Sequence, residues 1–256
     1  MNPAQTEHCV TLTDLTVGYN NHAAIHHLSG SFAPGSLTAI LGPNGSGKST
    51  LIKTIAGLLK PMGGTCRIAP DLRLAYLPQQ SELDRSFPAK VISLVSLGLW
   101  QKRGLFGRHR AEDRQAIAAA LRIVGLEGFD ARSIDSLSGG QLQRALFARV
   151  IVQDADLILL DEPFNAIDEK TIRDLIALIR RWHDERRTVI VVAHDLDLMR
   201  ATVPQSLLLA RRAVAWGPSA DVVTPENMRR ARAFQEAWDE NAPWCASPPA
   251  TAREVA

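Results

Sequence analysis

The chain has few cysteines, no long apolar run and almost no net charge, and each absence excludes a class of protein. The three cysteines, Cys9, Cys66 and Cys245, have an odd count and no metal-ligand spacing, so we expect reduced thiols in a cytoplasmic protein. The apolar runs are shorter than the roughly 18 residues that span a bilayer. The N-terminal MNPAQTEHC lacks the pattern of a signal peptide. A formal net charge of +2 does not indicate a nucleic-acid partner.

A glycine-rich stretch, GPNGSGKST, matches the pattern G-x-x-x-x-G-K-[ST]. An apolar run at 36–41 precedes it and a helical pattern at 51–59 follows, which is the context of a phosphate-binding loop. Glycines let successive N–H groups point at phosphate oxygens, and the helix adds its positive end. Lys48 would then reach the β and γ phosphates, and Ser49 would ligate Mg²⁺. The residues expected to hold the nucleotide are Gly42, Pro43, Asn44, Gly45, Ser46, Gly47, Lys48, Ser49 and Thr50.

Strand and helix patterns alternate along most of the chain and predict an α/β fold with a P-loop NTPase core. We expect a mostly parallel sheet with helices on both faces, plus an antiparallel β region near the N-terminus. The expected strands lie at 9–18, 24–32, 36–41, 65–69, 72–77, 156–160, 188–193 and 206–209, and the expected helices include 51–59, 142–152, 169–184, 196–201 and 225–239.

The domain organisation follows from changes in period and composition along the chain. Between about 85 and 153, apolar residues recur every three or four positions, which predicts a helical subdomain inserted into a domain of residues 1–240. Residues 241–256 are rich in Pro and Ala, which predicts a disordered tail.

Polar side chains follow three predicted strands. Asp161 and Glu162 end one, and Gln79 and His194 follow two others. Because the carboxyl ends of parallel strands share one edge, we expect all four beside the phosphate loop. Asp161 would orient Mg²⁺ and Glu162 would activate the attacking water as general base. Gln79 would contact Mg²⁺ or that water, and His194 a γ-phosphate oxygen. Taken alone, a glutamine or histidine here is more often structural.

A second helix start, at Ser138-Gly139-Gly140, offers another cluster of free N–H groups. One nucleotide already has its phosphate loop, so two interpretations stay open. The cluster could serve a nucleotide held by a second copy of the chain. Alternatively, Ser138 is an ordinary helix cap.

The order of these motifs resembles that of the ATP-binding cassette (ABC) ATPases, from Tyr19 to about His194. GPNGSGKST resembles the Walker A loop, LSGGQ the family signature and LILLDEP the Walker B strand. Gln79 resembles the Q-loop glutamine and His194 the switch histidine. The resemblance implies further nucleotide contacts by Tyr19, which would stack on adenine, and by Ser138, Gly139, Gly140, Gln141 and the D-loop Asp168.

This resemblance implies an enzyme that hydrolyses ATP as a head-to-tail homodimer, with each ATP between Walker A of one copy and LSGGQ of the other. Integral membrane permease subunits would be the direct partners, a substrate-binding protein an indirect one, and the cytoplasmic face of the plasma membrane the location. The surface that receives the permease would draw on Leu83, Phe87, Val91, Ile92, Leu99 and Trp100, several of which we also expect in the core. The basic loop 102–110 is expected to be solvated, with the lipid face as the alternative.

The segments SELDRSFPAKVISLVSLGLW and LSGGQLQRALFARVIVQDADLILLDEPFNAID look like those of zinc or manganese importers. Iron-chelate and cobalamin importers are similar here and are the alternative. His22, His26 and His27 lie in the nucleotide domain, where we expect no role in holding a metal. Asn165 and Ile167 depart from the usual D-loop. The C-terminal extension is short, so we do not expect a regulatory domain like those of some sugar or methionine importers.

A soluble ABC ATPase acting on DNA or ribosomes is the less favoured alternative. Chromosome-type members need a long coiled coil between Walker A and the signature, and the stretch from Lys48 to Ser138 leaves no room for one. Ribosome-acting members carry two cassettes, whereas this chain has one. A binding module without hydrolysis is disfavoured because Lys48, Glu162 and His194 are all present.

Overall fold

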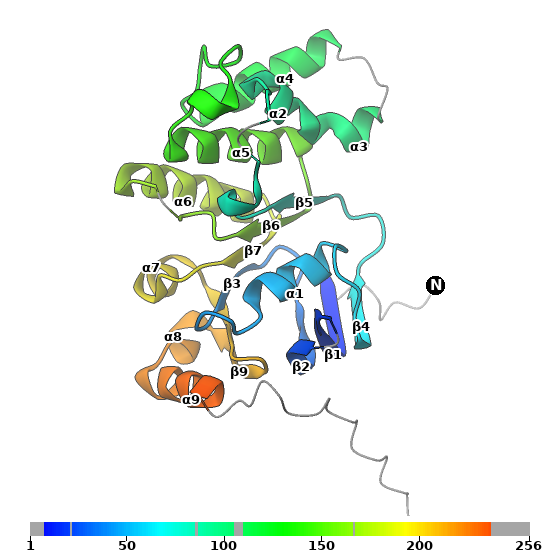
Figure 1. Ribbon diagram of the computed structural model, residues 1–256, viewed down its shortest axis with the longest axis vertical. Coiled ribbons are helices and arrows are strands. Elements are labelled where there is room, and N and C mark those ends of the chain that lie inside the picture. The colour runs from blue at the N-terminus through cyan, green and yellow to red at the C-terminus, as the bar shows by residue number, and fades with distance from the viewer. Residues whose placement is uncertain (1–7, 21, 85–86, 105–109, 166, 237–256) are drawn as a thin grey trace, which may run out of the picture.

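A computed structural model describes residues 8–20, 22–84, 87–104, 110–165 and 167–236 (Figure 1). Its main feature is a six-stranded sheet with the strand order β5-β6-β7-β3-β8-β9. The first five strands are parallel and β9 is antiparallel to β8. These strands are β5 (Leu74–Leu77), β6 (Leu157–Asp161), β7 (Thr188–Val192), β3 (Leu37–Leu41), β8 (Gln205–Leu209) and β9 (Ala213–Pro218).

The three central strands are buried along their whole length. Every residue of β3, β6 and β7 is buried, as expected where helices cover both faces of a parallel sheet. Successive residues face opposite cores: Ala39 packs with the core next to α5 and α6, and Ile40 with the core next to α1. The predicted α/β class and parallel sheet are therefore confirmed.

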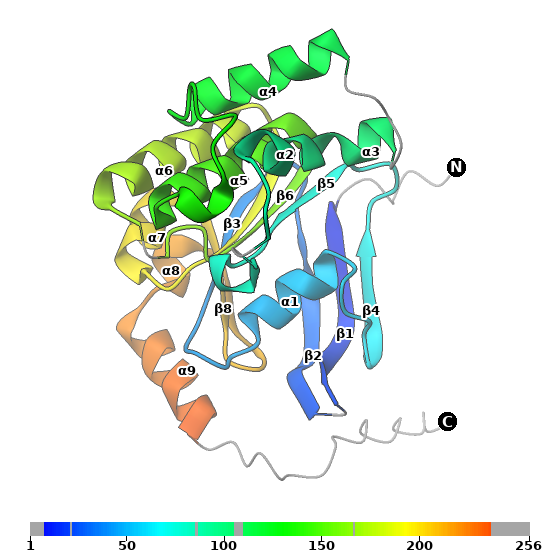
Figure 2. The same cartoon turned by 45° about the horizontal axis from the view of Figure 1, so that its top comes forward.

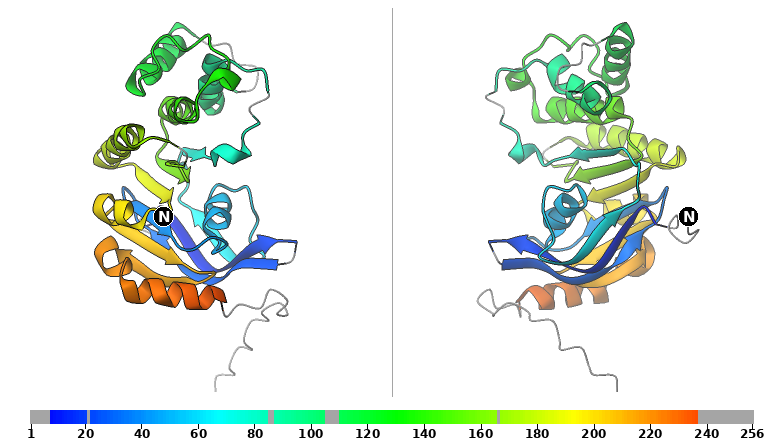
Figure 3. Two further views of the ribbon diagram at one scale, coloured as in Figure 1. Left: turned by 60° about the vertical axis from the view of Figure 1, so that its left-hand side comes forward. Right: turned by 90° about the vertical axis from the view of Figure 1, so that its right-hand side faces the viewer.

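An antiparallel sheet lies beside the parallel one, as predicted for the N-terminal region. Its strand order is β2-β1-β4, formed by β1 (Val10–Tyr19), β2 (His22–Phe32) and β4 (Gly63–Ile68). Helix α1 (Lys48–Ile55) packs between the two sheets and contacts strands of both (Figure 3). Its Leu51, Ile52 and Ile55 are fully buried there. The phosphate loop is thus attached to a helix that the two sheets hold in place.

Helices occupy the end of the molecule next to β5 (Figures 1 and 2). They are α2 (Val91–Ser96), α3 (Trp100–Arg103), α4 (Ala111–Ile123) and α5 (Gly139–Gln153), with 3-10 turns η2 (Gln80–Glu82), η3 (Leu97–Leu99) and η4 (Ile134–Ser136). The other helices are α6 (Glu169–Asp184), α7 (Leu196–Thr202), α8 (Ser219–Val222) and α9 (Pro225–Glu236). The expected tail at 241–256 lies outside the described residues.

Strand β9 and the short helix α8 had no counterpart among the expected elements. Strand β9 is an edge strand whose residues are half-buried or exposed. Its sequence, AVAWGP, contains no alternation of apolar and polar residues that would predict a strand. Helix α8 spans only four residues, too few to establish a helical period. Both are held by pairing with β8 and by packing on it, which are contacts that a local pattern does not contain.

Gly98, in η3, lies close to the backbone of α5. A Cβ at this position would lie 2.4 Å from the Arg149 carbonyl oxygen, which is a backbone atom with little room to move. We expect Gly98→Ala to lower the free energy of unfolding by about 1–3 kcal/mol, as overpacking does. Gly217→Ala is the matched control because a Cβ there meets nothing within 4 Å. Thermal denaturation of the two variants tests the contact, and equal stabilities would contradict it.

Candidate nucleotide site

The glycine-rich loop joins the end of β3 to the start of α1, as the sequence predicts. Gly45 and Gly47 have φ values of 76° and 97°, which favour glycine. A Cβ on Gly42 would lie 2.0 Å from the Leu209 carbonyl oxygen, so the loop also requires glycine for its close approach to β8. The helix begins at Lys48, with Gly47 as its N-cap. The loop is therefore wrapped around the positive end of α1.

Lys48 directs its side chain back over this loop. Its Nζ donates hydrogen bonds of 2.9 Å to the carbonyl oxygens of Gly42 and Pro43. The residue is only 5% exposed, and this burial lowers the pKa of Lys48, while the charges of Glu162 and Asp161 oppose the shift. The loop, the helix end and the ammonium group together make a site for an anion.

Three oxygen-bearing side chains meet behind the loop, and they are the three predicted to hold a metal. Ser49 Oγ donates to Asp161 Oδ1 at 3.1 Å, and Gln79 Nε2 donates to Ser49 Oγ at 3.2 Å. Asp161 has no exposed surface, and burial raises its pKa to about 6. Tyr76 was not predicted from the sequence, yet its hydroxyl lies 3.5 Å from Asp161 Oδ2.

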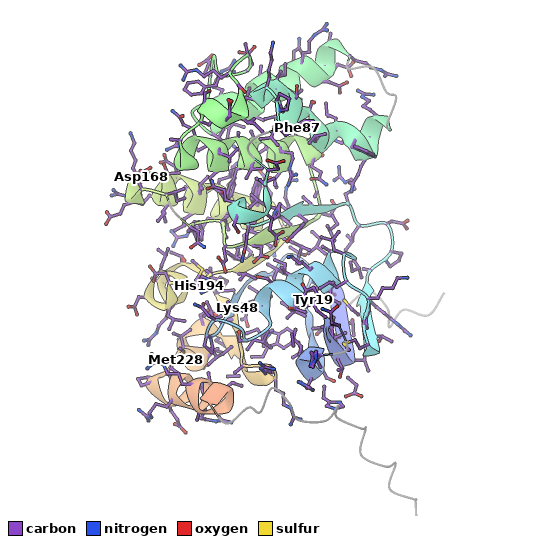
Figure 4. The ribbon with its side chains drawn as sticks, viewed as in Figure 1. Tyr19, Lys48, Phe87, Asp168, His194 and Met228 are labelled. Atoms are coloured by element: carbon purple, nitrogen blue, oxygen red, sulfur yellow. The ribbon has the colours of Figure 1, made fainter. Side chains whose placement is uncertain are left out.

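Glu162 directly follows the last residue of β6, and both of its carboxylate oxygens have hydrogen-bond partners. His194 Nε2 is 2.5 Å from Oε1, and Asn165 Nδ2 donates to Oε2. The backbone of Glu162 has a φ of 50°, an uncommon conformation for a non-glycine residue that is found at many active sites. Figure 4 shows His194 and Lys48 close together beside the start of α1. Asn165 was noted in the sequence only as a departure from a family pattern, and its contact with Glu162 is new.

These side chains, apart from Asp161 and Tyr76, line a cleft of about 610 Å³, within the range of small-ligand sites. The cleft is lined by Ala24, Asn44, Gly45, Ser46, Gly47, Lys48, Ser49, Thr50, Gln79, Glu162, Asn165 and His194. Four strand ends therefore converge at one edge of the sheet, as expected. Tyr19 is not among the lining residues; it ends β1 with 47% of its surface exposed.

The signature residues lie apart from this cleft. Ser138 caps α5: its Oγ accepts from the Gln141 N–H at 3.2 Å, and Gln141 Oε1 accepts from the Ser138 N–H at 3.0 Å. Asp168 caps α6 through the N–H and hydroxyl of Thr171, at 2.9 and 2.7 Å. A Cβ on Gly140 would lie 3.6 Å from Asp168 Oδ2, so the two caps are neighbours. Figure 4 shows Asp168 well away from Lys48.

The residues expected to receive a permease divide into two groups. Val91 and Leu99 are buried in the core, whereas Phe87 and Trp100 are 65% and 54% exposed. Leu83 and Ile92 are partly buried. The part of the basic loop at 105–109 lies outside the described residues.

The histidines and the helices bear on two further expectations. Within the described ranges, no three His, Cys, Asp or Glu side chains gather where they could hold a metal ion. His27 pairs with Asp14, its Nδ1 lying 2.8 Å from Oδ1. No helix in the described part of the chain combines the length and the apolar character needed to cross a membrane.

The parallel sheet, the glycine loop and the carboxylate at the end of β6 define a P-loop nucleoside triphosphatase. The family model for ABC transporters matches residues 25–165, more than half of the chain. The chain therefore belongs to the ABC transporter family, and ATP hydrolysis coupled to transport is the activity of this family.

Similar proteins extend over nearly the whole chain. The manganese transport system ATP-binding protein MntB of Halalkalibacterium halodurans is 37% identical over 88% of this chain and 90% of its own length. The zinc transport system ATP-binding protein TroB of Treponema pallidum is 36% identical over 88% of this chain and 87% of its own length.

Two solved structures are similar in fold as well as in sequence. One is an ABC transporter assigned to the metal-chelate type, in an inward-facing conformation (TM-score 0.79, 26% identity, 88% of this chain and 89% of that chain). The other is the dimeric cassette MJ0796 in a post-hydrolysis state bound to ADP and Pi (TM-score 0.71, 27% identity, 82% and 98%).

Proposed function

We propose that this protein is the ATP-hydrolysing subunit of an importer for a divalent metal ion, manganese or zinc. The convergence of Lys48, Ser49, Gln79, Glu162 and His194 on one cleft, with Asp161 behind it, supports ATP hydrolysis. The names of the similar manganese and zinc transport proteins support the cargo. Uptake of an iron chelate is the second candidate, because one similar structure comes from a metal-chelate type transporter.

The cluster behind the loop fits Mg²⁺, a hard cation that prefers oxygen ligands and keeps several waters. Ser49 Oγ and the Gln79 amide would hold it, and Asp161 would orient it through a water. When bound, Mg²⁺ neutralises charge on the β and γ phosphates. The buried Asp161 carboxylate, with Ser49 on one oxygen, provides the negative charge that such an ion needs.

The other side chains divide the catalytic work. The loop N–H groups and Lys48 hold the phosphates of ATP, and Tyr19 stacks on its adenine. Glu162 polarises the attacking water and takes its proton, since its carboxylate faces the cleft. His194, in contact with Glu162, binds a γ-phosphate oxygen and so orients the Glu162 carboxylate and the γ-phosphate relative to each other. Charge that develops on the phosphate is stabilised by fixed donors.

The residues that lie outside the cleft complete the site of a second copy. Ser138, Gly139, Gly140 and Gln141 form the start of α5, where free N–H groups attract an anion. Asp168, which caps the neighbouring helix, belongs to the same contact surface. In a head-to-tail homodimer, these residues meet the ATP held by the partner.

Closure of this dimer on ATP and its opening after hydrolysis would move permease subunits in the membrane. Phe87 and Trp100 present exposed aromatic surface on the helical end, which suits a protein partner. A substrate-binding protein would deliver the metal to the permease on the far side. The protein itself would act at the cytoplasmic face of the membrane.

Metal accumulation in cells tests the cargo. Cells that lack the protein should accumulate less manganese or zinc under metal limitation, and the wild-type chain should restore uptake. A Glu162→Gln chain should fail to restore it, because transport requires turnover. Isotope uptake of both metals and of an iron chelate, measured in the same strains, separates the candidates. Unchanged uptake of manganese and zinc would contradict the metal assignment, and a selective loss of chelate uptake would favour the second candidate.

A further inference from the structure

Gln143, in the first half of α5, forms a hydrogen-bonded junction with two segments of the nucleotide site. Its side chain is 2% exposed, and its Nε2 donates to the Pro163 carbonyl oxygen at 2.9 Å. Its Oε1 accepts from Gln80 Nε2 at 3.2 Å, and the same Gln80 nitrogen donates to the Gly139 carbonyl oxygen at 2.7 Å. The junction therefore joins the segment after β5, the segment after β6 and the first turn of α5.

Each end of this junction adjoins a residue of the site in sequence. Gln80 follows Gln79, which contacts Ser49, and Pro163 follows Glu162. Adjacent Cα atoms are separated by about 3.8 Å, so a shift of Gln79 or Glu162 displaces its neighbour. Gly139 lies beside Ser138 and Gly140, the residues that we assign to the partner's nucleotide. The two amides thus lie between the residues that serve a chain's own ATP and those that serve its partner's.

Burial of Gln143 strengthens its part of this junction. Hydrogen bonds in a low-dielectric interior are stronger than those in water, and a buried amide that loses its partner is costly. The Gln143 amide has an acceptor for its N–H and a donor for its oxygen. The hydrogen bond from Gln143 to Pro163 thus lies in the interior, and the two bonds from the half-buried Gln80 lie at its edge.

We propose that Gln143 and Gln80 are positioning residues that couple the two ATP sites of the dimer. Occupation of a chain's own cleft sets Gln79 and Glu162, and the junction sets the start of α5 for the partner's ATP. This inference rests on the proposed two-copy ATPase. Neither residue lines the cleft, so neither contacts the nucleotide held by its own chain.

The test is the ATP dependence of hydrolysis by the full-length chain. Two linked sites allow a Hill coefficient of up to about 2. Gln143→Leu should lower the Hill coefficient toward 1 and reduce turnover by about tenfold, which lies within the range of coupling between sites. ATP binding by the monomer should change by less than about twofold, because Gln143 does not line the cleft. Gln80→Leu should behave alike, and the double variant should add little to either change.

Gln153→Leu is the matched control, since Gln153 lies at the other end of α5 and its Nε2 donates to the Leu74 carbonyl oxygen at 2.7 Å. It loses a similar bond and should keep the wild-type Hill coefficient. A Gln143→Leu chain with wild-type cooperativity would overturn the inference and leave the proposed function standing. An equal loss of cooperativity in Gln153→Leu would also overturn the inference. A wild-type chain without cooperativity would count against the two-copy site itself, and the inference would fall with it.

Discussion

Glu162→Gln should stop ATP turnover and leave a dimer with ATP trapped in it. The substitution keeps the size of the side chain but removes the basic carboxylate, whose loss costs about 10²–10⁴-fold in rate for a general base. Glutamine can still contact His194 and Asn165, which now hold the two carboxylate oxygens, so the cleft should keep its shape. ATP binding should therefore survive while hydrolysis does not. Phosphate release and size-exclusion chromatography with ATP measure the two effects.

The control for this variant is Glu127→Gln. Glu127 lies on the surface, where its side chain is 73% exposed and pairs only weakly with Arg122 at 3.4 Å. Removal of this carboxylate should change neither the turnover nor the oligomeric state. Hydrolysis by Glu162→Gln at the wild-type rate would show that another group activates the water.

Ser138→Arg should abolish ATP hydrolysis and leave ATP binding by the single chain intact. Ser138 is remote from the cleft of its own chain, so Lys48 and its loop are unaffected. In the proposed dimer, the long side chain would fill the space that the partner's γ-phosphate needs. Loss of a group that stabilises transition-state charge costs about 10²–10³-fold. Steady-state hydrolysis and equilibrium binding of a fluorescent ATP analogue separate the two steps.

Because Ser138 also caps α5, a second substitution is needed to separate stability from catalysis. Loss of such a cap costs about 1 kcal/mol, whereas aspartate caps as well as serine. Ser138→Asp should therefore fold as stably as the wild type, yet its negative charge would repel the partner's phosphates. Both variants should be inactive. An active Ser138→Asp chain would show that this helix start does not meet a nucleotide.

The sequence predicts those parts of the fold that depend on local pattern. Apolar runs mark the buried strands β3, β6 and β7, and Glu169–Asp184 is a helix with the predicted bounds. Strand β9 could not be predicted, because its half-buried residues gain their structure from pairing with β8. Helix α5 begins at Gly139 with Ser138 as its cap, where the Ser-Gly-Gly sequence predicts a helix start, although the apolar period becomes visible only from Leu142.

The site divides in the same way. Parallel strands end at one edge, so the meeting of Gln79, Asp161, Glu162 and His194 follows from topology alone. The contacts of Tyr76 with Asp161 and of Asn165 with Glu162 depend on side-chain reach, which no spacing encodes. The junction at Gln143 is the clearest case. A glutamine inside a helix carries no pattern, and only its burial and partners reveal it.

In the proposed dimer, each ATP lies between the loop of one copy and the LSGGQ helix of another. A disulfide between two differently tagged chains tests this arrangement, one chain with Asn44→Cys, at an exposed loop position whose φ is not positive, and the other with Ser138→Cys. Both would carry Glu162→Gln and serine in place of Cys9, Cys66 and Cys245. Mild oxidation should link unlike chains when ATP is present and not without it, while each chain alone forms no link. Absence of the mixed link with ATP, or equal linking without ATP, would contradict the two-copy site.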